Sequence, residues 1–183
     1  MNFIPKKIFF TKGCGRHKEK LVSFELALRD AGIHFLNYVQ VSSIFPPNCK
    51  LISKEEGLKL IRPGQVSFIV MCRNDTNESR RLISCSVGLA LPADKSQFGY
   101  LSEHHDNGIT DEECGDYSED IACQMLSTII GVDFDINATY DERQETWKLS
   151  DKIVKTSNTT QSAIGSKGLW TTIISAAVLL LEE

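Results

Sequence analysis

"NYVQVSSIFPPN", residues 37–48, is a strand-like stretch that ends in two adjacent serines and a double proline. Side chains of a strand alternate between its two faces, so Asn37, Val39, Val41 and Ser43 are expected to share one face. The prolines stiffen the backbone immediately downstream, because each pyrrolidine ring locks φ. The stretch therefore predicts a strand that stops abruptly at two neighbouring hydroxyl groups.

The two hydroxyl groups, on Ser42 and Ser43, have two interpretations. Serines before a turn commonly hydrogen-bond to nearby backbone groups and have no further role. Alternatively, the Ser43 hydroxyl attacks the carbonyl of Ser42, an ester replaces the amide, and elimination of that ester breaks the chain. This reaction needs a locked and unusual backbone, which the following prolines favour. The residues alone leave both interpretations open.

The segment before this strand has the pattern of an amphipathic helix. Apolar side chains recur at helical spacing from Phe24 to Ala31, with Ser23 before them and Gly32 after them. We therefore expect a helix of about three turns that begins after Ser23. Glu25 would lie near its N-terminus, where the helix dipole favours a carboxylate.

The rest of the chain mixes strand and helix signals. A capping box of Thr110 and Glu113 opens a helix that Gly131 ends. The strand at residues 84–90 alternates small with larger side chains, so another sheet or backbone is expected to approach it closely. The polar stretch within residues 141–168 predicts a flexible segment. Further strands are expected at residues 6–13, 65–73, 80–91 and 133–141, with a buried apolar segment at 169–183. The mixture predicts an α+β fold.

Length and composition are those of a soluble globular protein. The 183 residues are 42% hydrophobic and 24% charged with a net charge of −4, so we expect one domain over residues 1–183. No basic block is present, which argues against nucleic acid as a partner. The C-terminal apolar run is shorter than the ~20 residues that cross a bilayer, so no membrane association is expected. Six scattered cysteines and no signal-peptide pattern predict reduced thiols and a cytoplasmic protein.

Acid–base side chains cluster at residues 103–105. Glu103 is a candidate general acid, and a solvated loop carboxylate is the alternative. A carboxyl group that donates a proton near neutral pH is expected to be partly buried. His104 and His105 are adjacent and would point to opposite faces of a strand, so no metal site is expected from them.

The order of these motifs resembles the archaeal-type pyruvoyl-dependent arginine decarboxylases. There, a helix of the form L-x-x-F-D-x-A-L-x-x-A-G-I leads to N-L-x-x-x-S-S-I-x-P-P. "LVSFELALRDAGIHFLNYVQVSSIFPPN", residues 21–48, is similar, with Glu25 at the aspartate position. "SVGLALPADKSQFGYLSE", residues 86–103, resembles the family's S-V-x-x-A-x-P-K-D-K-S-x-x-G-x-x-x-E. The resemblance covers roughly residues 9–130.

The resemblance implies that the chain is a proenzyme that cleaves itself between Ser42 and Ser43. Residues 1–42 would become the β chain, and residues 43–183 the α chain, headed by a pyruvoyl group made from Ser43. This covalent cofactor takes the place of pyridoxal phosphate, and no metal is expected. It would form an imine with the substrate amine, and L-arginine would lose CO2 to give agmatine. Agmatine would serve polyamine synthesis or acid resistance.

The resemblance also implies roles for single residues. Glu103 corresponds to the proton donor, Glu25 and Leu21 to substrate-binding positions, and Asn37 to an asparagine of processing and site orientation. Six residues of extended strand would separate Asn37 from Ser43 by about 20 Å. Either the strand bends sharply between them, or neighbouring subunits complete each other's sites. The resemblance implies a homotrimer, or a dimer of trimers, and therefore favours the second.

The fold implied by the resemblance is a four-layer αββα sandwich of two mostly antiparallel sheets flanked by helices. Glu25 and the altered segment at residues 13–20 leave two alternatives open. One is a pyruvoyl decarboxylase of a different amino acid. The other is a non-catalytic relative that acts as an assembly subunit.

Overall fold

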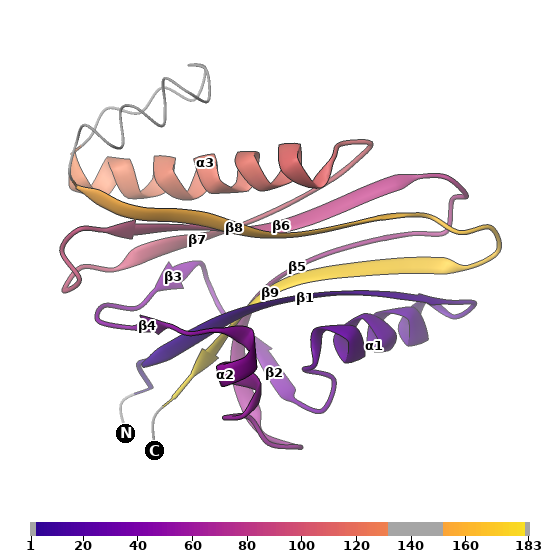
Figure 1. The fold of residues 1–183 in the computed structure, drawn as a ribbon, viewed down its shortest axis with the longest axis horizontal. Helices are drawn as coiled ribbons and strands as arrows, with labels where there is room; N and C mark the ends of the chain where they lie inside the picture. Colours follow the sequence, from indigo (N-terminus) through magenta and orange to yellow (C-terminus); the bar gives the residue numbers. More distant parts are fainter. Residues whose placement is uncertain (1–2, 132–151, 182–183) are drawn as a thin grey trace.

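The computed structural model describes residues 3–131 and 152–181 and is an α+β structure, as predicted (Figure 1). Within these residues the elements follow in the order β1 (Lys7–His17), α1 (Lys20–Ala31), β2 (Asn37–Gln40), β3 (Ile44–Phe45), β4 (Lys50–Leu51), α2 (Lys54–Leu58), β5 (Val66–Thr76), β6 (Leu82–Pro92), β7 (Gly99–Asn107), α3 (Asp111–Ile130), β8 (Ile153–Ile164) and β9 (Trp170–Leu180). No helix in these two ranges is long and apolar enough to span a membrane.

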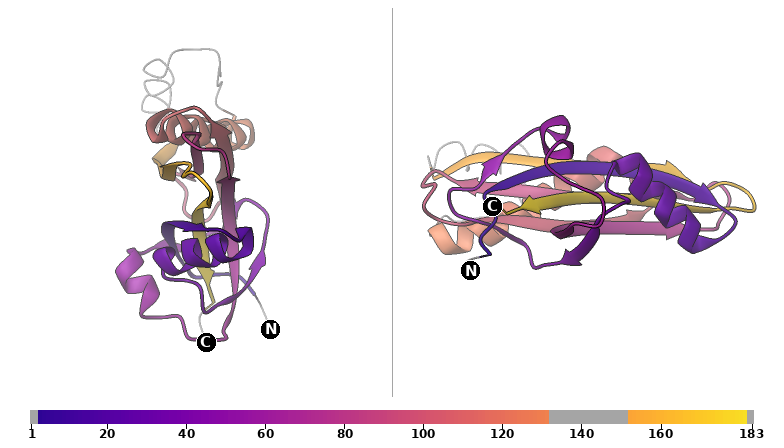
Figure 2. Two further views of the ribbon diagram at one scale, coloured as in Figure 1. Left: turned by 90° about the vertical axis from the view of Figure 1, so that its right-hand side faces the viewer. Right: turned by 90° about the horizontal axis from the view of Figure 1, so that it is seen from below.

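The strands form two sheets that lie face to face between outer helices (Figures 1 and 2). Sheet A has the strand order β2-β5-β9-β1-β4, and sheet B the order β3-β7-β6-β8. The pairings are antiparallel except those of β1 with β4 and of β2 with β5. Helices α1 and α2 pack on the outer side of sheet A, and α3 packs on the outer side of sheet B. The predicted sandwich of helices and two mostly antiparallel sheets is confirmed.

The alternation of side chains along β6 builds two layers of the core at once. Val87 and Leu89 are buried between the sheets, whereas Gly88 faces α3. A Cβ atom on Gly88 would lie 2.3 Å from the carbonyl oxygen of Ser118. The close approach predicted for this strand is therefore confirmed. The backbone that approaches is a helix and not a second sheet, because the larger side chains fill the space between the sheets.

We expect the Gly88→Ala variant to be destabilised by roughly 1–3 kcal/mol, because the added methyl group would force the backbone of α3 away from β6. Thermal unfolding measures the effect as a lower Tm. Ser84→Ala, on the same face of β6, adds no atom and is the matched control. A Gly88→Ala protein as stable as its parent would contradict the close helix–strand contact.

Strand β1 extends beyond the predicted residues 6–13 and reaches His17. Gly15 lies under α1, where an added Cβ atom would lie 2.1 Å from the carbonyl oxygen of Ser23. Glycine at this point marks a close helix contact and does not end the strand. The prediction of a shorter strand was wrong for that reason.

Helix α1 begins at Lys20, not after Ser23 as predicted. The Ser23 hydroxyl is buried inside the helix, where it donates to the Lys20 carbonyl oxygen and shares a 2.7 Å hydrogen bond with the hydroxyl of Thr172 on β9. The serine therefore belongs to a helix–sheet contact and not to a cap. Glu25 lies past the first turn, which contains no acidic residue. The predicted end is confirmed, since Gly32 takes the left-handed conformation with φ of 82°.

The polar stretch predicted to be flexible contains strand β8, which pairs along β6. Its polar side chains enter a hydrogen-bonded network beneath α3. The hydroxyls of Thr160 and Ser86 lie 2.8 Å apart, and those of Ser86 and Ser118 lie 2.6 Å apart. These polar groups form hydrogen bonds inside the protein, so the strand can be polar and still be buried. For that reason its sequence lacks the apolar alternation that predicts a strand. The strand predicted at 133–141 lies outside the described residues.

The chain crosses from sheet A to sheet B between β2 and β3 (Figure 1). Strand β2 ends at Gln40, so the strand predicted to reach the paired serines is shorter than expected. The Val41 N–H still donates to the Ile69 carbonyl oxygen of sheet A at 3.0 Å. The Ser43 carbonyl oxygen already accepts from the Leu101 N–H of sheet B at 2.8 Å. The serine pair therefore lies where the chain leaves one sheet for the other.

Candidate active site

A serine and a carboxylate predicted from the sequence meet at this crossing. The Ser43 hydroxyl donates a hydrogen bond to Glu103 Oε2 at 3.1 Å. The two are 60 residues apart and come together because β3 pairs with β7, with Ile44 opposite Tyr100. Continuing this antiparallel register places Ser43 beside Leu101. Glu103 lies two residues further along β7 and therefore on the same face as Leu101.

The backbone around Ser43 makes a tight turn. The Ile44 N–H donates to the Ser42 carbonyl oxygen at 2.9 Å, a hydrogen bond that spans two residues as in a γ-turn. A donor at this place stabilises negative charge that develops on the carbonyl oxygen under nucleophilic attack. This donor could not be predicted from the sequence, because every residue except proline has a backbone N–H group. The direction of that group depends on the folded backbone.

Strand β7 is anchored next to Glu103 by two thiols. Cys72 Sγ donates to the His104 carbonyl oxygen at 3.1 Å, and Cys114 Sγ lies 3.7 Å from the same atom. Burial raises the pKa of Cys114, which therefore stays a thiol at neutral pH. Burial also lowers the pKa of the His104 imidazole, so the side chain that follows Glu103 is uncharged at neutral pH. All six cysteines are free thiols.

Glu103 is exposed in the single chain. The prediction of partial burial is therefore wrong for one chain by itself. The reason is the shortness of β3, which pairs with β7 only at Gly99 and Tyr100. Beyond that point β7 is an edge strand of sheet B, so no described strand pairs with it on that side, and Glu103 stays exposed at the edge.

Three other predicted residues lie elsewhere. Asn37 starts β2 in sheet A, and its side-chain amide donates to the Gly64 carbonyl oxygen at 3.0 Å. Leu21 on α1 is 77% exposed. Glu25 pairs with Arg29 one turn further along α1, with an N–O distance of 2.6 Å. Across residues 3–131 and 152–181, no hydrogen bond or ion pair joins any of the three to the serine–glutamate pair.

The lysine of the altered segment, Lys20, is held by its neighbours. Its ammonium group forms an ion pair with Asp75 on β5 and lies 4.7 Å from the ring centroid of Trp170. The positive charge is therefore balanced by a carboxylate on sheet A. Among the residues that the structure describes, no group of three or more His, Cys, Asp or Glu side chains is placed to hold a metal ion.

Comparison with known proteins identifies the protein family to which this chain belongs. Residues 7–183 match the family model described as pyruvoyl-dependent arginine decarboxylase. The chain belongs to this family of pyruvoyl-dependent carboxy-lyases. A protein of Chlorobium limicola named probable pyruvoyl-dependent arginine decarboxylase is 63% identical over 180 residues, which are 98% of this chain and 99% of the relative.

Two further relatives are also similar over nearly their whole length. The pyruvoyl-dependent arginine decarboxylase of Nitrosopumilus maritimus is 51% identical, over 99% of this chain and 100% of its own. Pyruvoyl-dependent arginine decarboxylase 2 of Methanosarcina acetivorans is 47% identical, over 98% of this chain and 99% of its own. The similarity thus extends beyond residues 9–130, the range over which the sequence motifs resemble the family. It supports the arginine decarboxylase prediction and neither of the two alternatives.

Proposed function

We propose that this chain cleaves itself between Ser42 and Ser43 and that the mature protein decarboxylates L-arginine to agmatine and CO2. Membership of the family supports the reaction class. The observation that carries the assignment to these residues is the 3.1 Å hydrogen bond from the Ser43 hydroxyl to Glu103 at the crossing between the sheets.

Self-cleavage begins when the Ser43 hydroxyl passes its proton to the Glu103 carboxylate and its oxygen adds to the Ser42 carbonyl carbon. The Ile44 N–H, 2.9 Å from the carbonyl oxygen, stabilises the charge that forms there. The C–N bond then breaks, the nitrogen takes a proton, and an ester remains. Loss of the proton on Cα of residue 43 expels the Ser42 carboxylate and leaves a carbon–carbon double bond. Water then replaces the nitrogen, which leaves as ammonia, and a ketone results.

The surroundings of residue 43 fit a pyruvoyl group. When present, this group supplies an electrophilic carbonyl for the substrate amine and an electron sink for the pair released with CO2. The carbonyl oxygen of residue 43 accepts from the Leu101 N–H at 2.8 Å, and this donor stabilises negative charge that collects on that oxygen. Glu103, which lies beside residue 43 in the uncleaved chain, returns a proton to the substrate carbon in the mature protein.

The substrate-binding residues are proposed to come from a neighbouring subunit of a homotrimer or of a dimer of trimers. Glu25 would take the guanidinium group, Leu21 would contact the methylene chain, and Asn37 would orient the site. Three features of the single chain support this arrangement. Glu103 is exposed, Leu21 is exposed, and β2 is an edge strand whose Val39 is 46% exposed. Assembly would cover these surfaces and shield Glu103 from water.

The test measures cleavage and turnover on the same sample. The purified protein should separate into fragments 1–42 and 43–183, with the larger one blocked to Edman degradation. Release of CO2 from L-arginine should exceed that from lysine, ornithine and histidine by about tenfold or more in kcat/KM, because the site must pair a guanidinium group. An unbroken chain, or turnover of another amino acid without arginine, would contradict the proposal.

The control for the substrate test uses the ion pair on α1. Glu25→Gln removes the carboxylate and should raise KM for arginine by about tenfold, since a charge-assisted pair is lost. Arg29→Gln leaves the Glu25 carboxylate intact and removes its intrahelical partner. It should not raise KM. Equal increases in both variants would assign the effect to the helix and not to substrate recognition.

A further inference from the structure

Two side chains of β5 reach across from sheet A to the strand that carries Glu103. The Cys72 thiol donates to the His104 carbonyl oxygen at 3.1 Å, and the Asn74 amide donates to the Asp106 carbonyl oxygen at 2.9 Å. The two donors are two residues apart on β5 and therefore lie on the same face of that strand. Their acceptors are likewise two residues apart on β7. These hydrogen bonds join the two sheets immediately beyond Glu103.

Strand β7 has little other support on one side at this point. From Ser102 to Asn107 it pairs with β6 on one side and with no described strand on the other. A strand edge without a partner opens locally more easily than a strand that is paired on both sides. The hydrogen bonds from β5 therefore act on the part of β7 that its own sheet holds least firmly.

Glu103 and Cys72 lie on the same side of sheet B. Leu101 and Val87 are buried between the two sheets. Glu103 is two residues from Leu101 on β7 and pairs with Val87 of β6, so its side chain leaves the strand on the face turned toward sheet A. Cys72 belongs to the same buried cluster as Leu101 and Val87. The thiol therefore holds the backbone of β7 from the face on which the carboxylate projects.

The His104 carbonyl oxygen is contacted from both faces of sheet B. Cys72 approaches it from between the sheets, and Cys114 on α3 lies 3.7 Å from it on the helix-covered face. A carbonyl group held in this way resists tilting toward either face. A thiol is a weak donor, but Cys72 is 3% exposed, and a buried hydrogen bond has little competition from solvent. The backbone one residue beyond Glu103 is therefore fixed.

We propose that Cys72 is a positioning residue for Glu103, and that its hydrogen bond to β7 keeps the carboxylate beside residue 43. This inference rests on the proposed function, in which Glu103 accepts the Ser43 proton and later returns a proton to the substrate. The contact between the two side chains is 3.1 Å long in the uncleaved chain. A shift of β7 by about 1 Å would break it, and misplacement on that scale slows an enzymatic step by up to about a hundredfold.

The test compares Cys72→Val with Cys72→Ser. Valine fills the position but cannot donate, whereas serine keeps a donor. In Cys72→Val, the rate of self-cleavage and kcat for arginine per mole of cleaved chain should each fall about fivefold to tenfold, with KM unchanged. In Cys72→Ser both should stay within about twofold of the parent. If Cys72 only filled the core, the order would be reversed, because serine places a hydroxyl among apolar side chains. Faster cleavage and turnover in Cys72→Val than in Cys72→Ser would overturn the proposal.

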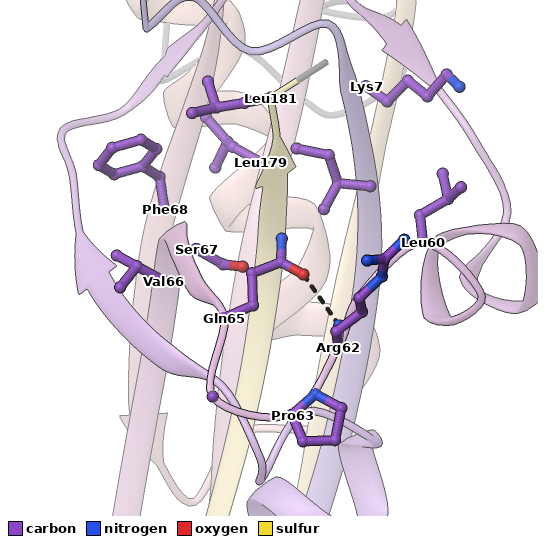
Figure 3. A pocket seen from close by; sticks show the side chains of 12 residues that line it. Lys7, Leu60, Arg62, Pro63, Gln65, Val66, Ser67, Phe68, Leu179 and Leu181 are labelled. Carbon is purple, nitrogen blue, oxygen red and sulfur yellow. Dashed lines mark hydrogen bonds between the residues drawn. The ribbon is translucent and has the colours of Figure 1, made fainter. Parts of the chain in front are cut away.

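Ser67→Ala is the control on the same strand. Ser67 is 3% exposed, as Cys72 is, but it lies at the other end of β5, beside a cavity that neither Ser43 nor Glu103 lines (Figure 3). Its hydroxyl has no hydrogen-bond partner among the described residues. This variant should be cleaved and should turn over arginine like the parent. A loss equal to that of Cys72→Val would assign the effect to β5 as a whole and not to the thiol.

Hydrogen exchange tests the role of Cys72 without any activity. It is measured in the Ser43→Ala variant, which keeps β7 and lacks the nucleophile. Backbone amides of residues 102–107 should exchange about fivefold faster when Cys72→Val is added than when Cys72→Ser is added. Equal exchange would overturn the inference even if the parent cleaves itself and decarboxylates arginine. A parent that does neither would contradict the proposed function, while faster exchange in Cys72→Val would still support the hold of Cys72 on β7.

Discussion

The Ser43→Ala variant should accumulate as a single chain of 20.5 kDa that never separates into two fragments. The methyl group of alanine has no oxygen to add to the Ser42 carbonyl carbon, so the amide cannot become an ester. Denaturing electrophoresis and intact mass distinguish one chain from two without any activity assay. Decarboxylation should also be absent, because no ketone is made.

Ser42→Ala is the control for this result. It removes the neighbouring hydroxyl, which takes no part in the proposed attack, and keeps the Ser43 hydrogen bond to Glu103. This variant should still be cleaved. If both variants stay intact, the block comes from a change in the backbone turn and not from loss of the nucleophile. Cleavage that persists in Ser43→Ala would falsify the assignment of Ser43.

The second large effect is expected for Glu103→Gln. An amide can accept the hydrogen bond from residue 43 but cannot donate an acidic proton to a substrate carbon. Turnover of arginine should fall by about a hundredfold or more, the scale typical of a lost general acid. Because Glu103 also accepts the Ser43 proton in the proposed cleavage, turnover is expressed per mole of cleaved chain, which intact mass counts.

Glu112→Gln is the matched control, since it neutralises an exposed carboxylate on the first turn of α3. It should be cleaved and should turn over arginine like the parent. Unchanged turnover per cleaved chain in Glu103→Gln would remove Glu103 from the role of proton donor. Equal losses in both variants would indicate a general effect of surface charge.

The two reacting residues can be predicted from the sequence, but the contact between their side chains cannot. Ser43 and Glu103 each fall on a motif, so residue type and order identify them. Their 3.1 Å contact depends on pairing between β3 and β7, and two residues of strand carry too little pattern to predict that register. The Ile44 N–H has no sequence signal at all, because it is a backbone group.

Errors in the predicted elements come from small and polar residues at internal contacts. Ser23 has the appearance of a helix cap and is part of the contact between α1 and β9. Gly15 has the appearance of a strand break and makes room for α1. Strand β8 is polar because its side chains bond beneath α3. By contrast, the ends of α3 follow the prediction, because the capping box of Thr110 and the left-handed Gly131 act locally.

If the chain cleaves itself, β1 ends up in a different fragment from the strands on either side of it. Sheet A holds β1 in its interior, between β9 and β4, and β1 pairs with β9 from Lys7 to His17. A break after residue 42 would place β1 in the smaller fragment, while both of its neighbouring strands, β9 and β4, would belong to the larger one. The two pieces would stay together in native buffer, yet refolding from denaturant would become bimolecular and slow upon dilution. The protein would thus be assembled reliably only once, as a continuous precursor.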